Sequence, residues 1–121
     1  MARMRILIAD DEEGIRESLN LILGEDYDLV FAENGEEALA KLRGERFALA
    51  FLDIKMPKLD GMEVLKQLNG NTVATPIIML TAYQSVELAQ DAVKFGARDY
   101  LPKPFDRDQI LSAVRGVLHG P

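Results

Sequence analysis

Short apolar runs alternate with longer amphipathic stretches along this chain, and the alternation occurs five times. Each apolar run has the length of a buried strand. The longer stretches repeat apolar residues at helical spacing, as in the stripe formed by Ile15, Leu19, Ile22 and Leu23. We therefore predict strands over about 5–9, 28–32, 48–52, 77–80 and 99–101.

Polar residues mark the ends of the predicted helices. Three pairs have the spacing of a capping box: Asn34 with Glu37, Asp60 with Glu63, and Asp106 with Gln109. Gly96 is a predicted C-cap, and Asn69-Gly70-Asn71 predicts a turn. The helices then run from Glu12 to Gly24, from the Asn34 cap to about Gly44, from the Asp60 cap to about Leu68, from Val86 to Phe95, and from the Asp106 cap through Val117.

Strands that alternate with helices predict an α/β fold. The expected architecture is a doubly wound, five-stranded parallel sheet with right-handed crossovers and helices on both faces. A length of 121 residues suits one domain, and we find no internal repeat or linker. We expect residues 1–121 to form a single domain, so that any output domain would lie beyond Pro121.

Composition narrows the classes of function. The 14 Lys and Arg residues against 20 Asp and Glu give a net charge of −6, which argues against direct nucleic-acid binding. The absence of cysteine excludes disulfides, thiolate metal sites and cysteine nucleophiles. The N-terminus does not resemble a signal peptide, and no apolar run approaches the roughly 20 residues of a membrane helix. We expect a cytoplasmic protein without a membrane partner.

Polar residues follow four of the predicted strands at the point where each strand ends. They are Asp10 and Asp11 after the first strand, Asp53 after the third, Thr81 after the fourth and Lys103 after the fifth. In an open parallel sheet, the carboxyl ends of the strands meet at one edge, where ligands bind. Such a set can hold a divalent metal, present a nucleophilic aspartate and neutralise a phosphoryl group. Mg²⁺ is the expected cation, because clustered carboxylates repel one another unless a hard cation compensates.

Each of these residues also has a purely structural interpretation. Asp10 and Asp11 are suited to cap the next helix, and for this pair alone capping is the favoured role. Thr81 suits a strand end, and Lys103 suits a solvated loop. Asp53 begins no strong helix, and an idle buried carboxylate is costly. The occurrence of the whole set at successive strand ends favours a site. The Lys103-Pro104 bond is a candidate cis peptide.

These motifs resemble the receiver domain of two-component response regulators, over the whole stretch from Arg5 to Leu118. The resemblance implies a CheY-like, flavodoxin-like fold with strand order 2-1-3-4-5. The motifs that carry it are Asp10-Asp11, Leu52-Asp53-Ile54-Lys55-Met56-Pro57, Asp60-Gly61, Thr81-Ala82, Gly96-Ala97, Tyr100 and Lys103-Pro104-Phe105.

The resemblance also implies roles for single residues. Asp53 would be the phosphoacceptor. Mg²⁺ would be held directly by Asp11, partly through water by Asp10, by Asp53, and by the backbone carbonyl of Lys55. The donor would be a phosphohistidine of a sensor histidine kinase or phosphotransfer protein, or a small molecule such as acetyl phosphate. The domain would catalyse only its own phosphorylation and dephosphorylation, so it would not be an enzyme in the usual sense.

A second group would convert phosphorylation into a conformational switch. Lys103 would pair with Asp53 at rest and with the phosphoryl oxygens afterwards, and Thr81 would donate its hydroxyl to the phosphoryl group. Ala82 would leave room for that group. Tyr100 would turn inward when Thr81 moves. Lys55 and Tyr83 would then set the lifetime of the phosphoryl group.

Two surfaces follow from the same resemblance. The output face would comprise the fourth helix, the fifth strand and the last helix, and would bind an output domain, a downstream protein or a second copy in a phosphorylation-dependent homodimer. Its residues are Val86, Leu88, Val93, Lys94, Tyr100 and Arg107, of which we expect most apolar members to be core. The kinase-facing candidates are Ile15, Leu19 and Pro104.

Two other functions remain as alternatives. A flavin-binding carrier has the same strand order but needs a phosphate-cradling loop after the first strand, where this chain has Asp10-Asp11-Glu12-Glu13. A receiver-like interaction module without phosphorylation needs none of the acidic, Thr and Lys residues. The complete set argues against this second alternative.

Overall fold

A computed structural model describes residues 3–68, 75–82 and 85–119 of the chain. Five parallel strands form one sheet in the order β2-β1-β3-β4-β5, which confirms the predicted fold class and strand order. The bounds of the strands are β1 Arg5–Ala9, β2 Asp28–Ala32, β3 Leu49–Leu52, β4 Ile77–Thr81 and β5 Asp99–Pro102. Each lies within a residue of the range that the apolar runs predict.

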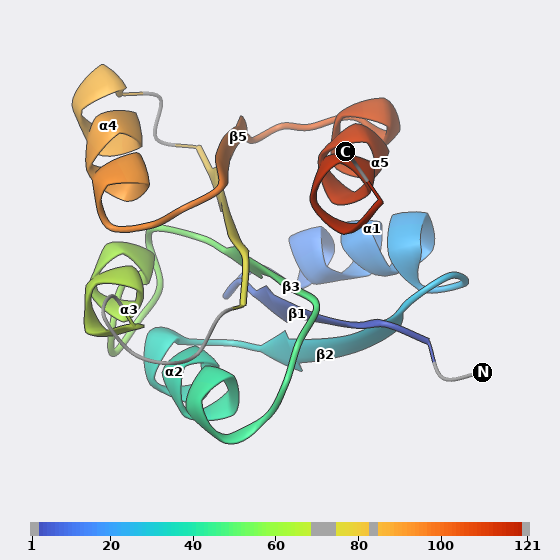
Figure 1. Cartoon of the computed structure of the whole chain (residues 1–121), viewed down its shortest axis with the longest axis horizontal. Coiled ribbons are helices and arrows are strands. Elements are labelled where there is room, and N and C mark those ends of the chain that lie inside the picture. The colour runs from blue at the N-terminus through green and yellow to red at the C-terminus, as the bar shows by residue number, and fades with distance from the viewer. Residues whose placement is uncertain (1–2, 69–74, 83–84, 120–121) are drawn as a thin grey trace.

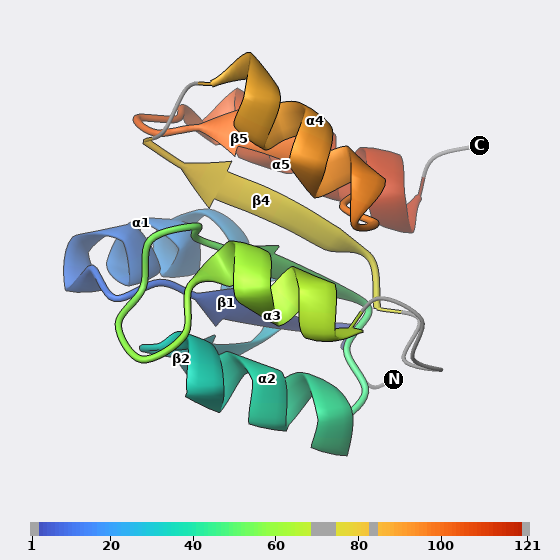
Figure 2. The ribbon, with the colours of Figure 1, turned by 90° about the vertical axis from the view of Figure 1, so that its left-hand side faces the viewer.

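Five helices cover the two faces of the sheet (Figure 1). Their bounds are α1 Glu13–Leu23, α2 Gly35–Gly44, α3 Gly61–Leu68, α4 Val86–Lys94 and α5 Arg107–Leu118. Figure 2 shows α2, α3 and α4 nearest the viewer, with α1 and α5 behind the sheet. None of the helices in the part of the chain that the structure describes is long and apolar enough to span a membrane.

Alternate residues of the central strands supply two separate cores. On β1, Ile6 and Ile8 face α1 and α5, whereas Leu7 and Ala9 face α2, α3 and α4. Side chains on both faces are therefore withdrawn from water, and this explains why β1, β3 and β4 consist of continuous apolar runs. Burial of this surface is the main force that holds the helices against the sheet.

Side-chain caps fix several helix ends. The Asn34 side chain accepts from the Glu37 N–H at 2.8 Å, and that of Asp60 accepts from the Glu63 N–H at 2.8 Å. Both halves of the predicted capping box of α5 are present. Gly96 follows α4 at a φ of 103°, a conformation that glycine adopts without strain. The predicted turn at 69–71 and Tyr83 lie outside the described residues.

Three predictions about burial are wrong. Leu19, a candidate for the kinase-facing surface, is fully buried against the sheet. Val86 and Val93, expected to be core, are 71% and 62% exposed. Helix α4 buries only Ala92 completely, because it packs against the sheet by a narrow stripe. Helical spacing indicates which residues share a face, but does not show how much of that face a neighbour covers.

Candidate functional site

The carboxyl ends of the strands hold the predicted side chains in fixed positions. The N–H of Asp10 donates to the Ala32 carbonyl, and the N–H of Asp53 donates to the Ala9 carbonyl, each at 3.0 Å. The hydrogen bonding of the sheet thus continues one residue beyond β1 and β3. In the same way, the N–H of Lys103 donates to the Thr81 carbonyl at 2.9 Å.

Lys103 lies at the centre of the acidic residues. Its Nζ is 2.7 Å from Asp10 Oδ2, 3.1 Å from Asp53 Oδ2 and 3.8 Å from Glu12 Oε1, and its side chain is only 8% exposed. The contact with Asp10 is an ion pair without the angles of a hydrogen bond, since Asp10 Oδ2 has no geometrically acceptable partner among the described residues. The predicted pairing with Asp53 is present, but Lys103 lies closer to Asp10.

Burial controls the electrostatics of these groups. It raises the pKa of Asp10. The charge of Lys103 and the hydrogen bond that Asp10 Oδ1 accepts from the Glu12 N–H both act to lower that pKa, but burial outweighs them. It also raises the pKa of Asp53, and the charge of Asp10 raises that pKa further. Burial by itself would lower the pKa of Lys103, but its contacts with Asp10 and Asp53 outweigh this effect and raise it. One cation therefore only partly compensates the carboxylates.

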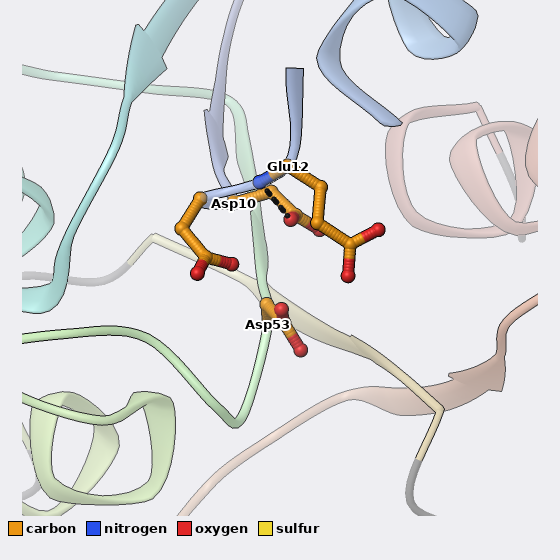
Figure 3. A group of neighbouring side chains, drawn as sticks. Asp10, Glu12 and Asp53 are labelled. Atoms are coloured by element: carbon orange, nitrogen blue, oxygen red, sulfur yellow. Dashed lines mark hydrogen bonds between the residues drawn. The ribbon is translucent and has the colours of Figure 1, made fainter. Parts of the chain in front are cut away.

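An acidic group at this edge has the composition of a magnesium site. Oxygens of Asp10, Asp11, Glu12 and Asp53 lie within 4.8 Å of one another. Figure 3 shows the side chains of Asp10, Glu12 and Asp53 gathered where β1 and β3 end, with the Glu12 N–H donating to Asp10. The residues fit Mg²⁺, because this hard cation takes carboxylate oxygens and keeps several waters.

A cavity of about 340 Å³ opens beside these carboxylates. Its lining consists of Asp11, Glu12, Asp53, Lys55, Ala82 and Lys103. The backbone of Lys55 acts to lower the pKa of the Asp53 carboxyl group, against the effect of burial, so the loop after β3 borders the site. The cavity has room for water and a small anion next to the Asp53 side chain.

The predicted switch residues lie on β4 and β5. Thr81 is fully buried at the end of β4, one residue before Ala82 in the cavity wall. Tyr100 pairs with Met79 in the sheet and is half-buried. Burial raises the pKa of its phenol, and a backbone hydrogen bond from Ser85, the N-cap of α4, opposes this effect. The Tyr100 phenol therefore lies near the backbone at the start of α4.

Sequence reasoning missed two residues near the site. Glu12 was placed at a helix start and in the acidic loop after the first strand but not among the metal ligands, yet it belongs to the acidic group. Arg16 was given no role, yet its guanidinium donates to the Asp10 carbonyl at 2.7 Å and lies 3.4 Å from Glu33. The sequence feature that could have indicated Arg16 is its spacing, because it lies one helical turn after Glu12 and so shares a face of α1 with that residue.

The loop after β5 contains the cis peptide bond that the sequence suggested. The Lys103-Pro104 peptide is cis. Of the kinase-facing candidates other than Leu19, Ile15 is half-buried and Pro104 is exposed.

Comparison with known proteins relates this arrangement to a family. The family model of the response regulator receiver domain matches residues 6–115. The chain is 41% identical over 116 residues to the response regulator MprA of Mycobacterium tuberculosis, and equally to that of Mycobacterium leprae. These matches cover 95% of this chain but 50% and 51% of those proteins. The chain thus spans about half the length of the curated relatives that it matches.

Solved structures agree with this assignment. The chemotaxis protein CheY4 of Vibrio cholerae superposes with a TM-score of 0.88 at 34% identity, covering 97% of this chain and 100% of that one. A CheY-like receiver domain protein of Methanospirillum hungatei gives 0.90 at 35%, with coverages of 97% and 94%. CheY of Borrelia burgdorferi, in a complex with CheX, BeF3 and Mg²⁺, gives 0.90 at 30%, with coverages of 96% and 90%. The chain belongs to the response regulator receiver domain family.

Proposed function

We propose that this receiver domain accepts a phosphoryl group onto Asp53 in a Mg²⁺-dependent reaction. The donor is a phosphohistidine of a sensor histidine kinase or phosphotransfer protein, or a small phosphodonor such as acetyl phosphate. The observation that carries the proposal is a buried Asp53 carboxylate that borders a cavity, 3.1 Å from Lys103 and within an acidic group that fits Mg²⁺. Family membership supports it, and we propose a cytoplasmic location for the domain.

The transfer exchanges one bond for another. A carboxylate oxygen of Asp53 forms a bond to phosphorus, while the bond from phosphorus to the donor imidazole nitrogen, or to the acetate oxygen, breaks. The leaving group keeps the electron pair, and a departing imidazole takes a proton from solvent. Such a reaction requires mainly positioning and neutralisation of charge. Asp11, Asp53 and the Lys55 carbonyl, with Asp10 partly through water, would hold Mg²⁺, which supplies charge neutralisation when bound.

The chain's own residues provide the remaining requirements. Lys55 borders the cavity beside the Asp53 carboxylate, and Lys103 lies where its ammonium can move from that carboxylate to a phosphoryl oxygen. Ala82 contributes a small side chain to the cavity wall. Thr81, at the end of β4, would donate its hydroxyl to the phosphoryl group. A phosphoryl group adds about −1.5 to −2 units of charge and three acceptor oxygens, so these donors gain a new partner.

The switch would pass from Thr81 to Tyr100. Since the backbone of Ser85 acts on the pKa of the Tyr100 phenol, the phenol lies near the start of α4, and movement of its ring would change how α4 begins. The α4–β5–α5 face exposes Val86 and Val93, apolar side chains that a partner could cover. We propose that phosphorylation alters this face and so controls an output partner or a homodimer.

Substitution of Tyr100 tests the switch separately from the chemistry. Tyr100→Ala should keep its phosphoryl adduct but weaken phosphorylation-dependent self-association or output binding, measured by sedimentation. Tyr100→Phe, which keeps the ring and loses only the hydroxyl, should have a smaller effect. An unchanged association constant in Tyr100→Ala would contradict this role.

Phosphoryl incorporation from acetyl phosphate, followed by intact mass, tests the acceptor. The wild-type protein should gain a single base-labile adduct with Mg²⁺ and none with a chelator, and Asp53→Asn should gain none. Asp60→Asn is the matched control, because Asp60 is exposed and asparagine caps a helix equally well. Failure of the wild-type protein with acetyl phosphate and with candidate kinases would favour an interaction module without phosphorylation.

A further inference from the structure

A glycine on α2 lies directly against the loop that leads from Asp53 to α3. An ideal Cβ atom at Gly35 would be 1.7 Å from the Leu59 carbonyl oxygen and 2.5 Å from its carbon. Real Cβ atoms essentially never come within 3.0 Å of another heavy atom in this way. The N–H of Gly35 also donates to the Pro57 carbonyl at 3.4 Å. A side chain at position 35 would therefore displace the β3–α3 loop.

Helix α2 itself does not require glycine at this position. Gly35 has an ordinary helical conformation rather than a positive φ, so its backbone is open to any L-residue. The Asn34 side chain caps α2 by accepting from the Glu37 N–H. Because the helix start is satisfied without Gly35, the requirement for glycine comes from the loop.

The β3–α3 loop is equally constrained at its other end. The N–H of Gly61 donates to the Ile54 carbonyl at 2.7 Å, and a Cβ atom at Gly61 would lie 2.0 Å from the Asp53 carbonyl oxygen. Between these contacts, the Leu59 N–H donates to the Pro57 carbonyl at 2.8 Å, and Lys58 has a φ of 70°. The loop is thus held by backbone contacts with α2 and with its own two ends.

Lys55 is the part of this loop that borders the site. It lines the same cavity as Asp53, which lies two residues before it in the chain. The direction of its carbonyl, the backbone ligand in the proposed magnesium set, depends on the path of the loop. A displacement at Leu59, four residues further along, would change that path.

We infer that Gly35 is a positioning residue for the magnesium site: its missing side chain lets the β3–α3 loop close against α2 and so holds the Lys55 backbone beside Asp53. The inference deepens the proposed function and rests on it. Gly35 is not part of the lining of the cavity beside Asp53, and it acts through Pro57 and Leu59.

Magnesium titration without a phosphodonor tests this role. Amide chemical shifts of wild type, Gly35→Ala and Gly44→Ala would be followed by NMR as MgCl₂ is added. Gly44 is the matched control, because it ends the same helix and a Cβ there meets nothing within 4 Å. We expect Gly35→Ala to bind Mg²⁺ about 10-fold more weakly, as for residues that orient metal ligands. Gly44→Ala should retain the affinity of the wild type.

A second variant protects the test against loss of folding. Alanine at Gly44 should stabilise α2, so Gly35→Ala/Gly44→Ala compensates stability without relieving the contact at Leu59. Weakened Mg²⁺ binding in the folded double variant supports the inference. Wild-type affinity in the Gly35→Ala variants overturns it and leaves the proposed function intact. Failure of the double variant to fold would show a structural role and also overturn it, whereas absence of Mg²⁺ binding in the wild type would overturn both proposals.

Discussion

The interiors of the central strands and their carboxyl ends are equally buried but chemically opposite. Leu7 and Ile78 lie within strands and are fully withdrawn from water. Asp10, Asp53 and Thr81 lie at the ends of β1, β3 and β4 and are 1%, 5% and 0% exposed. Alkyl side chains within a strand and the carboxylates that follow it a few residues later are therefore buried to about the same degree.

This difference separates the residues that stabilise the fold from those that carry its chemistry. Withdrawing alkyl groups from water is favourable. Burial of the carboxylates is unfavourable, and it raises the pKa of both Asp10 and Asp53. Groups with shifted pKa values cluster at functional sites, where the residues needed for reactivity lower the stability of the folded protein. The following substitutions test this contrast.

The largest effect should come from the strand interior. Leu7→Ala should lower the free energy of unfolding by about 3 kcal/mol, because it removes buried methyl groups and leaves a cavity. Urea unfolding measures this change. Leu21→Ala is the matched control, since Leu21 is 80% exposed, and it should change stability by less than about 0.5 kcal/mol. Equal losses in the two variants would contradict the assignment of the core.

A smaller loss is expected when the cation of the site is removed. Lys103→Met should lower the free energy of unfolding by about 2 kcal/mol at neutral pH, because Asp10 and Asp53 lose their nearby positive charge. The deficit should shrink as the pH falls, since protonated carboxylates no longer require a cation. Urea unfolding at several pH values checks this, and a deficit that does not depend on pH would indicate lost packing instead.

Removal of a carboxylate should instead increase the stability of the folded protein. In the Mg²⁺-free protein, Asp53→Asn should raise the free energy of unfolding by about 1 kcal/mol at neutral pH. Because the folded-state pKa of Asp53 is raised, the folded protein holds this proton more tightly than the unfolded chain does. The cost of ionisation is therefore absent below the usual value of 3.8 and develops as the pH rises through the raised pKa.

Thermal unfolding of both proteins across this pH range measures that gain. The advantage of Asp53→Asn should grow with pH and then level off. Asp60→Asn, at an exposed helix cap, should show no such gain. An advantage that shrinks as the pH rises would mean that the Asp53 pKa is lowered in the folded state, contrary to the effect of its burial.

Local patterns were sufficient to predict the fold and most of the polar residues that lie together at the carboxyl edge of the sheet. Short apolar runs located the strands, and parallel topology placed Asp10, Asp53, Thr81 and Lys103 at one edge. What sequence could not supply were distances between segments remote in the chain. The closer approach of Lys103 to Asp10 than to Asp53 is one such distance.

Contacts that depend on packing were also beyond the sequence. The close approach of Gly35 to Leu59 brings the start of α2 against the β3–α3 loop. Sequence alone does not show why a helix begins with glycine, because the reason lies in the loop that packs beside it. The same limit explains the errors at Leu19 and Val86. Their helical positions are correct, but their exposure depends on how closely each helix packs against the sheet.

The location of the phosphoryl group tests the central claim most directly. Wild-type protein treated with acetyl phosphate and Mg²⁺ would be reduced with borohydride, which converts an aspartyl phosphate to homoserine, and its peptides sequenced by mass spectrometry. Homoserine at position 53, absent from a chelator-treated control, is the predicted result. Homoserine at another aspartate, or phosphate retained on a hydroxyl side chain, would contradict the assignment of Asp53 as the phosphoacceptor.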